Sequence, residues 1–129
     1  MQVALACIAL LGLLLFGLGN AVSITRRSAN TPIGSSPDPA DRLFKLVRAH
    51  GNSAEYAPFL AVLMLAVGSR EPASWLLWCM GLATAARYLH AAGMLLSPTL
   101  ARPHPLRFVG ALGTYLTGLL LSVGLLLSL

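Results

Sequence analysis

The sequence predicts an all-α membrane protein, a bundle of four transmembrane helices. Of its 129 residues, 57% are hydrophobic and only 10% are charged, whereas soluble domains average about 25% charged residues. The apolar residues fall into four long blocks, and each block approaches the ~20 residues that a helix needs to cross the hydrocarbon core. We therefore expect residues 1–129 to form a single multi-pass membrane domain with little chain outside the bilayer.

The first helix is expected at about residues 1–24, because the chain is almost continuously apolar from Val3 to Leu18. A cleaved signal peptide is the alternative interpretation. However, no charged side chain precedes Val3, and the apolar run is longer than a usual signal-peptide core. An uncleaved first spanning helix is therefore the better interpretation.

A loop rich in proline, glycine and serine, residues 23–40, separates this helix from a second one expected at about 41–68. Asp38 or Asp41 is suited to cap the start of that second helix. Pro58 lies inside it and lacks an N–H group, which predicts a kink.

The third helix is expected at about 73–96, with Pro72 in its first turn and Trp75 and Trp78 in an interfacial aromatic belt. The fourth is expected at about 106–129, after a loop at 97–105. Small residues recur on it at intervals of four, which predicts close packing against another helix. These residues are Gly110, Thr114, Gly118 and Ser122.

The cations indicate how the chain is oriented in the membrane. The first and third loops and the helix starts beside them hold Arg26, Arg27, Arg42, Lys45, Arg102 and Arg107, whereas the second loop holds only Arg70, beside Glu71. Because cytoplasmic loops are enriched in Lys and Arg, we expect loops one and three in the cytoplasm and both termini opposite. The Ala- and Leu-rich composition with short loops suggests a bacterial inner membrane. The net charge of +5 does not indicate nucleic-acid binding, since no basic cluster accompanies aromatic residues on a soluble face.

The candidate site lies on the second helix. Arg48, Asn52 and Glu55 fall at i, i+4 and i+7 and share one helix face, with Tyr56 on its flank. A cation, an amide and a carboxylate together can bind a ligand that carries both signs of charge. Ionisable residues within a membrane each cost ~2.5–3.5 kcal/mol on insertion scales, which makes them functional candidates. In the alternative, structural interpretation, Arg48 extends to the lipid headgroups and Glu55 pairs with a neighbouring arginine.

Other chemistries have no matching motif. The sequence contains no phosphate-binding glycine loop, no H-E-x-x-H, no nucleophile elbow and no pair of carboxylates suited to acid–base work. Cys7 and Cys79 form no ligand pattern with the histidines, so we expect no metal site. Any catalysis would depend on cations and tyrosines acting on a bound reagent such as a thiol.

The pattern Arg48-x-x-x-Asn52-x-x-Glu55-Tyr56-x-Pro58 resembles the signature of the MAPEG family, the membrane-associated proteins in eicosanoid and glutathione metabolism. The resemblance extends to four spans, to Arg26-Arg27 near the end of the first and to Arg87-Tyr88 late in the third. It implies a homotrimer of four-helix bundles that binds glutathione between subunits, at the cytoplasmic side. Lipophilic small molecules and membrane lipid would be the other partners.

The resemblance also implies a role for individual residues. Those expected to bind glutathione are Arg26, Arg48, Asn52, Glu55, Tyr56 and Tyr88. Arg107 is the candidate for catalysis, with Arg102 second, because a nearby cation lowers a thiol pKa from ~8.5 and the thiolate is the nucleophile. Two positions depart from the family pattern: His50 stands where a glutamine can occur, and Ala92 stands where a second tyrosine is found.

The function expected from this resemblance is a glutathione transferase or peroxidase acting on lipophilic electrophiles or hydroperoxides from the bilayer. The alternative is a non-catalytic membrane protein of the same fold that binds an anionic lipid or metabolite.

Overall fold

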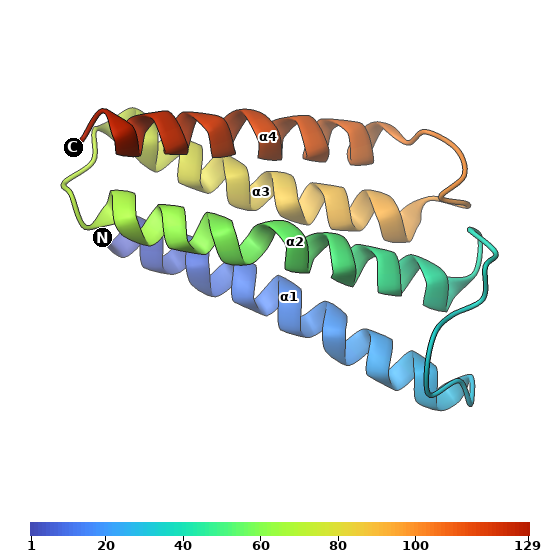
Figure 1. Cartoon of the computed structure of the whole chain (residues 1–129). Coiled ribbons are helices and arrows are strands. Elements are labelled where there is room, and N and C mark those ends of the chain that lie inside the picture. Colours follow the sequence, from blue (N-terminus) through green and yellow to red (C-terminus); the bar gives the residue numbers. More distant parts are fainter.

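The structure, a computed structural model, describes all residues 1–129 and contains four α-helices and no strands. The helices are α1 (Gln2–Ser28), α2 (Arg42–Gly68), α3 (Ser74–Leu96) and α4 (Pro105–Leu126). Successive helices run antiparallel, so both termini lie at one end of the bundle and the α1–α2 and α3–α4 loops lie at the other (Figure 1). The all-α, four-helix prediction is confirmed.

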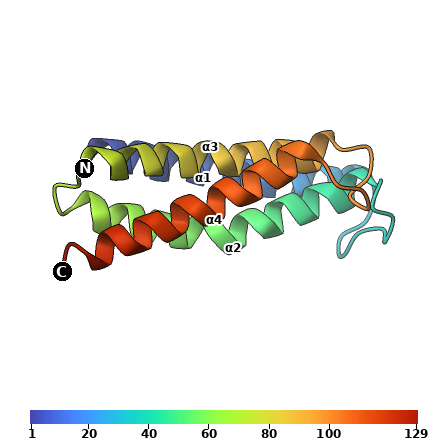
Figure 2. The ribbon, with the colours of Figure 1, turned by 90° about the horizontal axis from the view of Figure 1, so that it is seen from above.

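The arrangement of the helices leaves the first and last apart. α1 packs mainly on α2, α4 packs mainly on α3, and α2 and α3 join the two pairs, while α1 and α4 do not touch. Seen from above, α4 crosses the bundle obliquely (Figure 2). By length and composition, α1 and α4 are apolar enough to cross a membrane. α2 and α3 have comparable lengths, but neither contains a stretch that is apolar enough by the same measure.

The helix ends differ from the expected ones at three places. α1 does not end near residue 24 but continues to Ser28, so Arg26 and Arg27 lie in its last turn. Cations there complement the negative end of the helix dipole, which explains why the charges do not terminate the helix. Pro72 lies before α3 and not in its first turn, since that helix begins at Ser74. α4 begins at Pro105 and ends at Leu126, three residues earlier than expected.

Asp41 caps α2, as one of the two sequence alternatives predicts. Its Oδ1 accepts a hydrogen bond of 2.8 Å from the N–H of Phe44. Asp38 instead closes a turn in the preceding loop by accepting from the N–H of Ala40, also at 2.8 Å. α2 passes through Pro58 as one continuous helix.

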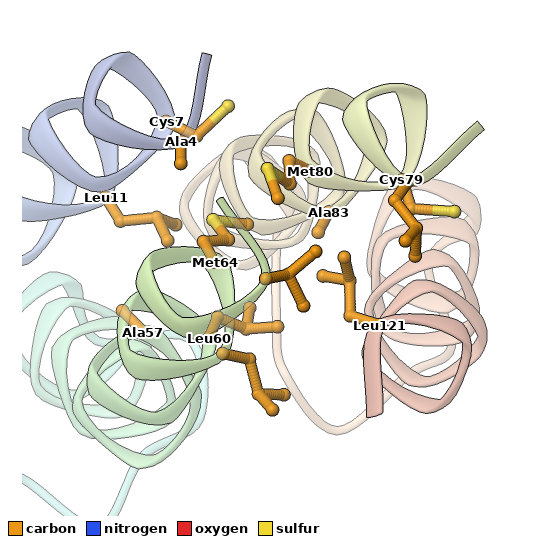
Figure 3. Packing of buried hydrophobic residues seen from close by; sticks show 13 residues of the cluster. Ala4, Cys7, Leu11, Ala57, Leu60, Met64, Cys79, Met80, Ala83 and Leu121 are labelled. Carbon is orange, nitrogen blue, oxygen red and sulfur yellow. The ribbon is translucent and has the colours of Figure 1, made fainter. Parts of the chain in front are cut away.

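Two apolar clusters fill the bundle. The larger lies towards the termini and includes Leu11 of α1, Met64 of α2 and Met80 of α3, together with the buried cysteines Cys7 and Cys79 (Figure 3). The smaller lies towards the long loops, and its buried residues come from α1, α2 and α3. Between the two clusters, α2 and α3 carry a set of polar residues that we term the polar layer. Its members are Asn52, Ser53, Tyr56, Thr84 and Arg87.

Glycines bring α3 and α4 into close contact near their shared loop. A Cβ atom on Gly110 would lie 2.5 Å from the backbone nitrogen of His90, and one on Gly93 would lie 2.6 Å from that of Arg107. The predicted packing role of the small residues of α4 is therefore confirmed at Gly110. Gly93 supplies the matching position on α3.

Gly110→Ala is accordingly expected to destabilise the bundle by about 1–3 kcal/mol, because a side chain there must push two backbones apart. Thermal unfolding of the detergent-solubilised protein would measure this change as a lower melting temperature. Gly81→Ala, in α3, is the matched control, since a Cβ at Gly81 meets no atom within 4 Å. Equal melting temperatures for the two variants would contradict the close contact.

Candidate functional site

Arg87 of α3 is the centre of the polar layer. Its side chain is only 1% exposed. Its Nη2 donates a hydrogen bond of 2.7 Å to Oδ1 of Asn52, and its guanidinium carbon lies 5.2 Å from the ring centroid of Tyr56. A charge-assisted hydrogen bond and a cation–π contact therefore join α3 to the polar face of α2. The sequence reasoning noted Arg87 in the Arg87-Tyr88 pair late in the third helix and gave it no role in the site.

Asn52 connects the buried cation to a carboxylate. Its Nδ2 points to Oε2 of Glu55 at 3.5 Å, a long hydrogen bond. The amide thus offers its oxygen to the guanidinium and its NH₂ to the carboxylate. Glu55 itself is exposed. In the structural interpretation of the sequence, Glu55 pairs directly with a neighbouring arginine. Within this chain, Asn52 instead lies between Glu55 and Arg87 and contacts both.

Tyr56 extends the cluster to α4. Its hydroxyl donates to the hydroxyl of Tyr115 at 3.4 Å, and the two rings are tilted by 50° with centroids 5.8 Å apart. Tyr115 was missed by the sequence reasoning. The available signal was weak: a single tyrosine within an otherwise apolar fourth helix, next to Thr114 of the small-residue stripe.

A groove of about 530 Å³ between α2 and α4 begins at this cluster. Its polar groups come from Glu55, Tyr56 and Tyr115, with Thr114 and Ser122 of α4. Most of the remaining wall is apolar, including Phe59, Leu63 and Leu119. The groove therefore places charged and hydroxyl groups beside a surface that suits a hydrocarbon chain.

Arg48 lies one turn before Asn52 on α2 and is exposed. Of the residues expected to bind glutathione, Asn52, Glu55 and Tyr56 are thus linked by contacts with one another or with Arg87. Arg48 follows on the same helix face, with its charge available to a ligand.

Three predicted residues lie away from this cluster within the chain: Tyr88, Arg26 and Arg107. The hydroxyl of Tyr88 donates to the backbone oxygen of Leu10 on α1, at 2.9 Å. Arg26 lines a separate polar cavity of about 440 Å³ at the end of α1, together with Arg27 and Asn30. The Nε of Arg26 is buried there without a partner.

Arg107 is held by its own loop. Its Nη1 donates to the backbone oxygens of Leu100 and Arg102, at 3.2 and 3.1 Å, and its backbone oxygen lies 2.9 Å from Nδ1 of His90. Arg102, the second candidate, is exposed. Since α1 and α4 do not touch, one chain alone does not bring Arg26 and Arg107 together.

The two departures from the family pattern also lie apart from the cluster. The ring of His50 packs against α1, where a Cβ on Gly19 would lie 3.2 Å from its Nε2. Ala92 is half-buried on α3. Neither residue therefore substitutes for a polar contact of the α2 face.

A comparison with protein families matches residues 4–127 of the chain to the model of the MAPEG family. No curated protein and no solved structure matches the chain significantly. The match covers all four helices, and with them every residue of the polar layer and of the groove.

Replacing Arg107 with methionine is expected to loosen the α3–α4 loop, because two backbone oxygens lose a charged donor. Amide hydrogen exchange in residues 98–104 should become faster in Arg107→Met. Arg102→Met, which changes an exposed arginine in the same loop, is the control and should leave the exchange rates unchanged. Unaltered exchange in Arg107→Met would show that these two hydrogen bonds do not hold the loop.

Proposed function

This chain belongs to the MAPEG family of membrane proteins in eicosanoid and glutathione metabolism, and we propose that it is a transferase or peroxidase that uses glutathione as its co-substrate. The observation that carries the proposal is the position of a charged face of α2 beside the apolar groove between α2 and α4. A water-soluble charged reagent and a lipophilic molecule could thus meet at one place.

The charges of this face match those of glutathione. The tripeptide carries two carboxylates, one ammonium group and one thiol. Arg48 can bind a carboxylate with two parallel hydrogen bonds, and Glu55 can pair with the ammonium group. The half-buried Tyr56 adds a hydroxyl group near the same position.

We further propose that the site is shared between subunits of a homotrimer. Arg26 and the α2 face lie in different parts of one chain, yet both carry groups that suit an anionic ligand. If α1 of one subunit packs beside α2 of the next, Arg26 completes the site from the neighbouring subunit. The cation-rich loops support a site on the cytoplasmic side, and we propose the bacterial inner membrane as its location.

An arginine of the α3–α4 loop would stabilise the thiolate. Arg107 is the candidate from the family resemblance, but its Nη1 already donates to two backbone oxygens. The exposed Arg102 lies on the segment that Arg107 holds. This geometry favours Arg102 as the cation near sulfur, with Arg107 shaping the loop.

The lipophilic substrate would occupy the groove. Its apolar wall suits a hydrocarbon chain, and the hydroxyls of Tyr56 and Tyr115 can donate hydrogen bonds to an oxygen of an electrophile or hydroperoxide.

A second candidate function is non-catalytic binding of an anionic lipid or metabolite. It is favoured by the polar cavity at the end of α1, where Arg26 and Arg27 lie close to Asn30 and Thr31. Basic pockets of this kind on the cytoplasmic side of membrane proteins bind anionic headgroups.

Glutathione binding, measured by calorimetry on the purified protein in detergent, tests the proposed function. We expect saturable binding that weakens roughly tenfold or more in Arg48→Ala and in Glu55→Gln, because each loses a charged contact worth about 1.5–3 kcal/mol. Glu71→Gln, in the loop at the opposite end, is the matched control and should bind like the unmutated protein. Failure of the unmutated trimer to bind glutathione would exclude the proposal and favour the non-catalytic function.

Mixed trimers test whether the site is shared. Trimers of Arg26→Ala alone and of Arg48→Ala alone should each lose glutathione binding. Trimers assembled from both subunits together should regain part of it, since some interfaces then combine an intact Arg26 with an intact Arg48. No recovery in the mixed trimers, with the trimeric state verified, would place both arginines in a site within one subunit.

A further inference from the structure

The buried charge of Arg87 lacks a direct counter-ion. The side chain lies between the two apolar clusters, and its partners are a neutral amide oxygen and the face of an aromatic ring. Its Nε is buried without any hydrogen-bond partner. A cation at such depth is expensive and rarely present without a function. The contacts of Arg87 indicate what that function is.

Arg87 determines which way the amide of Asn52 points. Oδ1 is bound to the guanidinium, so Nδ2 faces the carboxylate of Glu55. If the amide turned over, its oxygen would face the carboxylate and its NH₂ would face the guanidinium, and both contacts would become repulsive. The cation therefore enforces the one orientation that attracts Glu55 towards the polar layer.

The same guanidinium also packs over the ring of Tyr56. A planar group can donate to Asn52 along its edge while its face contacts a ring, whereas an ammonium group acts as a point charge and cannot hold both neighbours in this way. Arg87, on α3, thus restrains the side chains of both Asn52 and Tyr56 on α2.

We propose that Arg87 is a positioning residue of the glutathione site, which acts through Asn52 to hold the Glu55 carboxylate where it meets the ammonium group of the ligand. This inference rests on the proposed function. It also adds a role for Asn52: each end of its amide makes one contact within the chain, so Asn52 orients Glu55 and keeps only its second N–H and second lone pair for a ligand. A purely structural Arg87 would only fasten α3 to α2.

The two roles differ in ligand selectivity, which calorimetry can measure with glutathione and with an analogue that lacks the α-ammonium group. The unmutated protein should prefer glutathione by roughly tenfold or more, because the analogue leaves the Glu55 charge unpaired. Arg87→Lys keeps the positive charge but loses the planar guanidinium that contacts Asn52 and Tyr56 together. This variant should reduce the preference for glutathione to about twofold or less. Glu55→Gln should abolish the preference and serves as the reference for complete loss.

Gly110→Ala is the control for destabilisation without a change at the site, and Arg70→Lys is the control for the chemical change alone. Both should retain the full preference for glutathione.

Asn52→Ala is the second variant, should Arg87→Lys fail to fold. Asn52 is only half-buried, so water can replace its contact with Arg87. The Asn52→Ala variant should lose the preference for glutathione to the same degree as Arg87→Lys. The double variant, Asn52→Ala with Arg87→Lys, should show little further loss.

The outcomes separate this inference from the proposed function. A normal preference in Arg87→Lys and in Asn52→Ala, with glutathione still bound, would overturn the positioning role and leave the function standing. Equal weakening of both ligands would do the same, because it would show a structural effect only. Absence of glutathione binding by the unmutated protein would overturn both.

Discussion

The buried guanidinium of Arg87 is the constraint around which the bundle is arranged. Two apolar clusters can pack on either side of it only if the intervening layer supplies polar partners, and α2 provides them as the amide of Asn52 and the ring of Tyr56. Because these partners are neutral, the charge is balanced at longer range through Asn52 by Glu55. The polar layer therefore fixes how α2 and α3 face each other, at mid-height of the helices.

The same layer connects packing with the proposed ligand chemistry. Tyr56 and Glu55 belong both to the contacts that hold the layer and to the rim of the groove between α2 and α4. Groups that are restrained from inside the protein are better prepared to bind, since less freedom is lost when the ligand arrives. α4 can lie beside them in this way because glycines let it approach α3 closely near the loop. That approach also fixes Arg107 against His90 and leaves Arg102 exposed.

A single chain separates several groups that the resemblance assigns to one ligand. Arg26 ends α1, Tyr88 is bound to α1, and Arg107 is held by its loop. α1 and α4 do not touch in the bundle. This separation is the physical reason for proposing a site shared between subunits, in which α1 of one copy meets the α2 face of another.

The sequence by itself determined the helical class, the number of helices and the shared face of Arg48, Asn52 and Glu55, and it narrowed the cap of α2 to Asp38 or Asp41. These features depend on hydropathy, on local capping chemistry and on the helical repeat, all of which are encoded within a few residues. The tertiary structure alone decided that Arg87 binds Asn52, 35 positions away, that Tyr115 joins the site, and that Tyr88 turns to α1. Such contacts depend on how helices are rotated against one another, and that rotation follows from the packing of glycines and buried side chains over the whole bundle. The end of α1 was missed for a local reason, since arginines in a last turn stabilise a helix and do not end it.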